Sequence, residues 1–130
     1  MTPAIIVAEP SMKTKRIRLR ALTVAVAVAA LAIWGWVLRR RSVFFASEAD
    51  KHYHRLELCQ ANRDSIFDGY VVTPRREQLT EADKERLAYF ERWVSYEKQL
   101  VRKYRRAAML PLVLPEHDPP PPSPFHSWLH

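Results

Sequence analysis

The chain has 130 residues, two glycines, one cysteine and a formal net charge of +7. Two glycines are too few for a glycine-rich phosphate-binding loop, and a single cysteine excludes an intrachain disulfide. Residues 1–41 hold eight Lys or Arg and one acid, whereas residues 42–130 hold thirteen of each. A nucleic-acid-binding domain concentrates basic residues on its folded face, so this distribution argues against nucleic acid and favours contact with anionic lipid headgroups.

Eighteen consecutive residues, from Ala21 to Leu38, contain no ionisable side chain and predict a transmembrane helix. An α-helix of this length rises about 27 Å, close to the roughly 30 Å hydrocarbon core of a bilayer. Leu31 lies within the span, and Trp34 and Trp36 lie near its C-terminal end, where interfacial aromatic residues gather. The lipid bilayer is therefore the first expected partner.

Basic residues flank this span on both sides. The leader, residues 1–20, has five basic residues, among them Arg16, Arg18 and Arg20, and three more follow the span directly: Arg39, Arg40 and Arg41. The count favours a cytoplasmic N-terminus by the positive-inside rule. A cleaved secretory signal is the alternative, but arginines directly after the apolar run are typical of a stop-transfer flank. We therefore expect an uncleaved single-pass anchor.

A juxtamembrane helix is predicted over residues 39–68. The chain has no proline between Pro10 and Pro74, so this helix is expected to continue from the span without a break. Its apolar side recurs at steps of four and three residues: Phe45, Ala49, His52, Leu56 and Cys59. Asp68 and Gly69 predict its end, with the glycine in the left-handed cap conformation.

A second amphipathic helix is predicted over residues 80–110, after a connection over residues 69–79. Thr80 is a good N-cap with Asp83 three residues on, and Pro111 ends the helix. Its apolar positions again have helical spacing: Leu87, Phe90, Trp93, Val94, Leu100, Val101, Tyr104, Ala107 and Ala108. Two such helices predict an antiparallel hairpin. The aromatic residues exceed what one helix can cover, which suggests self-association or a membrane partner.

The tail, residues 111–130, contains seven prolines, and Pro119 to Pro122 predict a polyproline II conformation. One interpretation is a stiff spacer or a strap packed along the hairpin. The other is a ligand for an aromatic-lined groove on a partner. Five residues are candidate partner contacts: Trp93, Tyr104, Pro119, Pro120 and Trp128.

No residue pattern in the sequence predicts catalysis, a cofactor or a metal site. His52 and His54 diverge by about 200° on a helix and cannot share a metal, so His52 is expected to face the hairpin and His54 the solvent. Cys59 on the apolar side is predicted to be an inert buried thiol. Glu91 and Glu97 are mixed with the basic and aromatic residues of the second helix, where a solvated, neutralised face is expected.

The order of these segments resembles short single-pass membrane proteins of planctomycete bacteria. The matching pieces, within residues 13–122, are the Ala/Val-rich stretch Arg20–Ala29, Tyr53-His54-Arg55-Leu56-Glu57, Lys103-Tyr104-Arg105-Arg106-Ala107-Ala108, Pro111 and Asp118-Pro119-Pro120. The chain differs in two places: Tyr96-Glu97 stands where a second Tyr-His is expected, and Leu112 follows Pro111 in place of tryptophan. The resemblance implies the same architecture and assigns no activity.

The expected fold class is all-α, with one N-terminal transmembrane helix, an antiparallel helical hairpin and a proline-rich C-terminal tail. The expected role is that of a non-enzymatic, membrane-anchored adaptor for a protein partner. The alternative is a small accessory subunit of a membrane transport or secretion complex, whose span packs on other helices through Ala25, Ala29 and Ala32. Leucine substitutions on this alanine face would discriminate, because only the subunit would lose complex formation.

Overall fold

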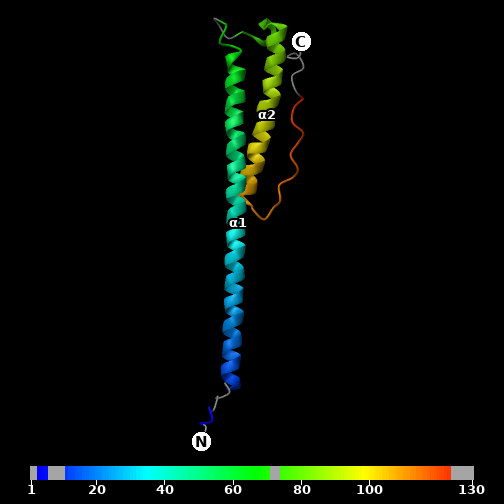
Figure 1. Ribbon diagram of the computed structural model, residues 1–130. Helices are drawn as coiled ribbons and strands as arrows, with labels where there is room; N and C mark the ends of the chain where they lie inside the picture. Colours follow the sequence, from blue (N-terminus) through cyan, green and yellow to red (C-terminus); the bar gives the residue numbers. More distant parts are fainter. Residues whose placement is uncertain (1–2, 6–10, 71–73, 124–130) are drawn as a thin grey trace. The chain divides into compact units, whose positions relative to one another are not determined.

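The computed structural model describes residues 3–5, 11–70 and 74–123, and within these ranges all regular secondary structure is helical. The elements are helix α1 (Met12–Ser65), the 3₁₀ helix η1 (Arg76–Gln78) and helix α2 (Glu81–Met109) (Figure 1). The chain divides into two compact units, Met1–Val37 and Leu38–His130, with α1 running through the boundary. The predicted uninterrupted helix through the arginines is therefore confirmed.

The described part of the first unit consists mainly of the N-terminal portion of α1. Every residue from Ser11 to Val37 is exposed. Among the described residues, α1 is the one helix long and apolar enough to cross a membrane. Within the apolar stretch, the Thr23 hydroxyl is hydrogen-bonded to its own helix: Thr23 Oγ1 donates to the Leu19 carbonyl at 2.9 Å.

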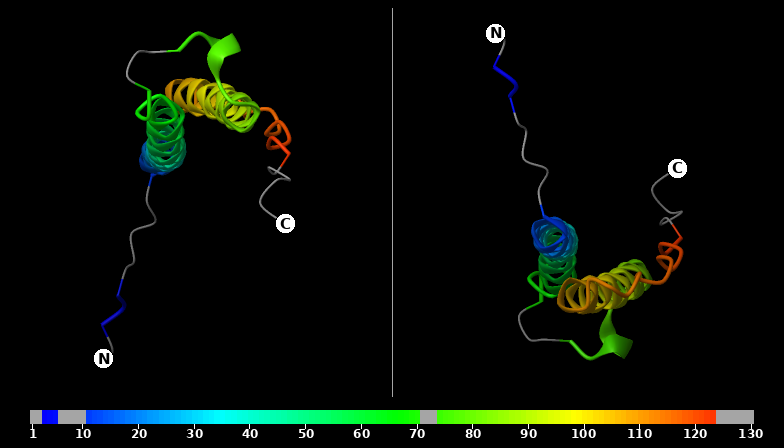
Figure 2. Two further views of the ribbon diagram at one scale, coloured as in Figure 1. Left: turned by 90° about the horizontal axis from the view of Figure 1, so that it is seen from above. Right: turned by 90° about the horizontal axis from the view of Figure 1, so that it is seen from below.

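The second unit is built on an antiparallel pairing of α2 with the part of α1 that follows Leu38. Three contacts give the register: Ser42 Oγ donates to the Ala108 carbonyl at 2.7 Å, the Phe45 ring stacks on Tyr104, and His52 contacts Glu97. Both end-on views in Figure 2 show the two helices side by side. The predicted hairpin is confirmed.

The hairpin core follows the predicted apolar side of α1. Phe45, Ala49, His52 and Leu56 are buried at steps of four and three residues, and Cys59, one step further, is half-buried. On α2 six residues are buried: Leu87, Val94, Glu97, Leu100, Val101 and Ala107. Alternating three- and four-residue steps on facing helices are the pattern of coiled-coil packing, in which each side chain inserts between residues of the partner helix.

Helix α1 ends at Ser65, three residues before the predicted end. The predicted left-handed glycine cap is wrong, because Gly69 does not have a positive φ. Successive tight turns satisfy the last carbonyls instead: the amides of Ile66, Phe67 and Asp68 donate to the residues three before them. A left-handed residue is therefore not needed to end the helix.

Helix α2 begins and ends where local signals predict. Thr80 Oγ1 accepts a hydrogen bond from the Asp83 amide at 3.2 Å, which confirms the N-cap. The last helical residue is Met109, and the Leu110 amide closes the final turn on the Arg106 carbonyl. Pro111 cannot continue the helix and restricts the residue before it. Of the connection over residues 69–79, residues 71–73 lie outside the described part.

The described tail, residues 111–123, contains no helix and returns along α2 (Figure 1). Asp118 fastens it: Lys103 Nζ donates to Asp118 Oδ1 at 2.6 Å, and the Tyr104 hydroxyl donates to Asp118 Oδ2 at 2.9 Å. We call residues 115–123 the strap. Residues 124–130, including Trp128, lie outside the described residues.

Candidate membrane and partner surfaces

The predicted span presents its side chains outward along its whole length. Leu31 is 72% exposed, and Trp34 and Trp36 are each 60% exposed. Ala21 is exposed as well, while Leu38 at the start of the second unit is half-buried. Such a continuous apolar surface is far larger than the patches that soluble monomers leave in water.

Charged residues flank this surface on both sides in the sequence. Five of the six predicted flanking arginines are exposed, and Arg41 is half-buried: Arg16, Arg18, Arg20, Arg39, Arg40 and Arg41. Long arginine side chains at the ends of an apolar helix can extend to lipid headgroups while their methylene groups remain in the apolar layer. The arrangement thus suits a helix end at a bilayer surface.

A buried polar pair lies at the centre of the hairpin. His52 Nδ1 and Glu97 Oε2 are 2.7 Å apart, and the two residues are 9% and 1% exposed. This distance is that of a hydrogen bond between the imidazole ring and the carboxyl group. The prediction that Glu97 lies on a solvated face is wrong, because Glu97 is buried against α1, where it contacts His52.

This pair continues through an aromatic ring to the strap. The His52 ring stacks on the Tyr104 ring with centroids 5.4 Å apart and planes 3° from parallel. Burial and the hydrogen bond to Asp118 raise the pKa of Tyr104 to about 12. The hydrogen bond from Lys103 and that from Tyr104 lower the pKa of the Asp118 carboxyl. We call Glu97, His52, Tyr104 and Asp118 the polar cluster; it joins α1, α2 and the strap.

The polar cluster has a structural role, because its contacts connect α1, α2 and the strap. Hydrogen bonds join Glu97 to His52 and Tyr104 to Asp118, and ring stacking connects the two pairs, so that each polar side chain has a partner. Among the described residues, neither His52 nor Glu97 lines the groove identified in this unit, and no group of three His, Cys, Asp or Glu could hold a metal ion.

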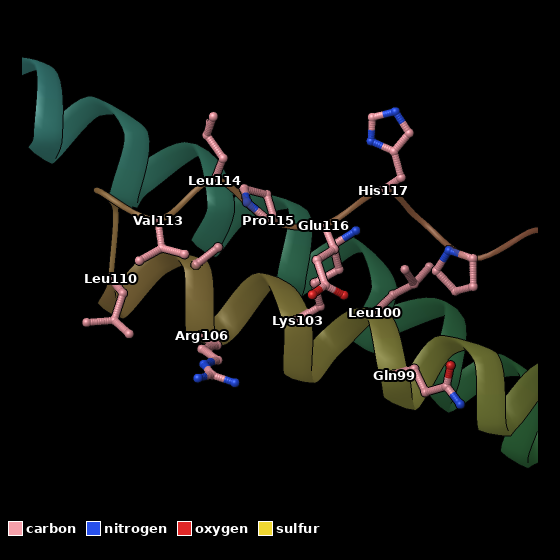
Figure 3. A pocket seen from close by; sticks show the side chains of 12 residues that line it. Gln99, Leu100, Lys103, Arg106, Leu110, Val113, Leu114, Pro115, Glu116 and His117 are labelled. Atoms are coloured by element: carbon pink, nitrogen blue, oxygen red, sulfur yellow. The ribbon is translucent and has the colours of Figure 1, made fainter.

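That groove, of about 600 Å³, lies between the C-terminal half of α2 and the residues leading into the strap (Figure 3). Leu100 and Ala107 lie on its α2 side, and Val113 and Pro115 on its opposite side. Lys103, Arg106 and Glu116 add charge to its lining. Figure 3 shows His117 pointing away from α2. The groove is thus a mixed apolar and charged surface.

The candidate partner contacts are distributed unevenly. Tyr104 is engaged within the polar cluster, Pro119 is half-buried at the groove, and Pro120 is exposed. Trp93 is half-buried against the edges of neighbouring tyrosines, and its buried Nε1 has no hydrogen-bond partner among the described residues. Trp128 lies outside the described residues, so its predicted role stays a prediction.

The predicted orientations of the two histidines are confirmed. His52 is buried in the hairpin, whereas the His54 side chain is 76% exposed and lies 3.4 Å from Glu57. Burial, and then the charge of Glu97, raise the pKa of the Cys59 thiol. A raised pKa reduces the fraction of thiolate and hence the nucleophilicity of Cys59.

Glu97 and Asp118 are structural residues that were not predicted from the sequence. A signal for Glu97 was present: it continues the three- and four-residue steps of Leu87, Val94 and Val101. Since His52 lies on the facing apolar side of α1, an acid on the second stripe could have been paired with it. The contact of Asp118 depends on the path of the tail, for which the sequence holds no such periodic signal.

Comparison with family models, curated proteins and solved structures finds no match for this chain.

Proposed function

We propose that this chain is a non-enzymatic, single-pass membrane adaptor with a cytoplasmic N-terminus, whose C-terminal unit binds a protein partner. One observation carries the proposal: α1 exposes its apolar side chains from Ala21 to Val37. A bilayer removes this surface from water, and the helix satisfies its own backbone hydrogen bonds, as a lipid environment requires. The arginines on either side supply the headgroup contacts.

The second unit supports the adaptor role through its construction. Its most buried acid, Glu97, is used to hold the two helices together, and Asp118 holds the strap. These contacts connect both helices and the strap, and the unit follows the predicted span along the chain. Such a unit, tethered to a membrane by the span, is available to bind a protein partner.

The experiment begins with the anchor. Carbonate washing of native membranes should leave the full-length chain in the pellet, and mass spectrometry should find residues 1–41 in the mature protein. Release into the supernatant, or a mature form that begins after Arg41, would overturn the membrane anchor.

Photocrosslinking in native membranes then tests the partner. A photoreactive residue at Leu58, which is 65% exposed on the hairpin, should crosslink a protein, whereas one at Ala25 in the span should yield lipid adducts. Protein crosslinks from Ala25 alone would favour the accessory subunit. Absence of protein crosslinks from any exposed position of the second unit would refute the adaptor.

A further inference from the structure

The segment Met109–Leu114, which we call the apolar loop, exposes a cluster of large apolar side chains. Its six residues contain no charged or hydrogen-bonding side chain. Five of them are strongly exposed: Met109 81%, Leu110 49%, Leu112 64%, Val113 60% and Leu114 70%. The Val113 amide closes a turn on the Leu110 carbonyl at 3.0 Å, so the backbone of the loop is held while its side chains face outward.

Within the second unit, the apolar loop lies beside the first residues of that unit's α1 portion. The hydrogen bond from Ser42 to Ala108 connects the end of α2 to this part of α1. Ser42 follows Leu38 by four residues, a helical rise of about 6 Å. The polar headgroup layer on each side of a bilayer is about 5 to 8 Å thick. Val43 and Phe44, 62% and 57% exposed, add apolar surface at the same level.

Basic side chains accompany the apolar loop. The last two turns of α2 contribute Arg102, Arg105 and Arg106, all exposed, and Arg39 and Arg41 precede Ser42 on α1. Large apolar side chains surrounded by arginines are the pattern of segments that insert shallowly into anionic membrane surfaces.

We infer that the apolar loop inserts its side chains into the interfacial layer of the membrane that α1 crosses, as a second membrane contact of the C-terminal unit. The inference rests on the proposed membrane anchor, since chain connection to the span holds the loop at the bilayer surface. The occupant is an anionic bilayer: acyl chains receive Leu112 and Val113, and phosphate groups meet the arginines. The hairpin is then attached to lipid at two points.

Nitroxide labels in the full-length protein test the inference in vesicles of phosphatidylcholine and phosphatidylglycerol. In a Cys59→Ser background, one cysteine at a time is introduced by Leu112→Cys, Leu58→Cys or Ala25→Cys. Leu58 is the matched control because it is also a leucine and is 65% exposed, against 64% for Leu112. Power saturation compares collisions of each label with apolar oxygen and with a polar nickel chelate.

The expected result is a shift of the oxygen-to-nickel collision ratio at Leu112 towards the value at Ala25, with Leu58 remaining open to nickel. A Leu112 label as open to nickel as Leu58, beside a lipid-exposed Ala25, would overturn the second contact alone. A Leu112 label shielded from both reagents would also overturn it, because a second copy of the chain would then cover the loop. An Ala25 label open to nickel would instead overturn the proposed anchor.

Discussion

Replacing Glu97 by leucine tests whether the buried pair holds the hairpin together. Glu97 is 1% exposed and lies 2.7 Å from His52 Nδ1. Leaving a buried hydrogen-bonding group without its partner costs about 1–3 kcal/mol. His52 keeps its stacking on Tyr104 and slight exposure. Because the pair is almost fully buried, we expect a loss of about 3 kcal/mol for Glu97→Leu, at the upper end of this range.

Hydrogen exchange of the full-length protein in lipid nanodiscs measures this loss. Protection of amides in residues 94–101 should fall by roughly a hundredfold, since each 1.4 kcal/mol of local stability corresponds to a factor of ten. Glu97→Gln keeps the shape and a hydrogen-bonding group and should lose about tenfold. The double change His52→Leu with Glu97→Leu should recover most of the protection, because two apolar groups leave no buried polar group unpaired.

Two results would contradict the role of the His52–Glu97 pair. If Glu97→Leu exchanges as slowly as the native chain, the carboxylate does not contribute to the hairpin. If the double variant exchanges as fast as Glu97→Leu, the cost comes from packing rather than from an unpaired His52. Amides in residues 20–30 serve as the internal control, because exchange in a lipid-covered helix should not respond to either change.

Asp118→Ala should release the strap and make it cleavable by limited proteolysis, whereas Pro120→Ala should leave it protected; equal cleavage of both would contradict the fastening role. The folded pKa of Asp118 lies below its ordinary value of about 3.9. The stability that Asp118 contributes to the folded strap is therefore complete above that pH and is lost as pH falls through the lowered pKa. Amide chemical shifts of the strap will follow this loss. The pKa of Tyr104 is raised from about 10 to about 12. The stability that its protonated hydroxyl contributes is therefore complete below pH 10 and is lost between pH 10 and 12. A ¹³Cζ signal that titrates near pH 12 should vanish in Tyr104→Phe, and its persistence would refute the assignment. Trp93→Asp should lower the thermal midpoint well below that of Trp93→Phe, because a half-buried site cannot hydrate the charge; equal midpoints would argue against packing there.

The elements that the sequence predicts well are those whose signals are local. The apolar run from Ala21 to Leu38 and the lack of proline through residue 65 predict one long helix, and the structure has one. Thr80 and Pro111 mark the limits of α2 because a side-chain cap and a missing amide act within one turn. Gly69 misled the prediction since glycine permits a left-handed cap but does not require one.

The features that the sequence does not predict depend on contacts between distant segments. Whether Glu97 faces water or α1 is decided by the register of the hairpin, which pairs positions 45 residues apart. A local view of mixed charges on α2 places that acid on the surface. The strap depends in the same way on Asp118 meeting Lys103, which requires the tail to reverse direction after Pro111.

Helix α2 has more apolar residues than one stripe facing α1 can bury, and the unit covers them in two stripes. One stripe, Leu87, Val94, Glu97 and Val101, faces α1, while Leu100 and Ala107 lie on a second stripe beside the groove under the residues that lead into the strap. Leu100 is nonetheless only 1% exposed, so the hairpin and the returning chain together remove it from water. Self-association is therefore not needed to cover this stripe.

The apolar side chains that remain open in the second unit are concentrated in the apolar loop and the first residues of the hairpin. The first residues of the hairpin follow the predicted span by only a few helical turns. The apolar loop lies beside them, because the hydrogen bond from Ser42 to Ala108 joins the end of α2 to this part of α1. The second unit buries Leu100 under its own tail but leaves Met109 and Leu114 exposed. This difference suits an apolar environment at the end that carries the apolar loop, and water along the rest of the unit. The position of the exposed leucines, rather than their number, is therefore the argument for lipid at that end.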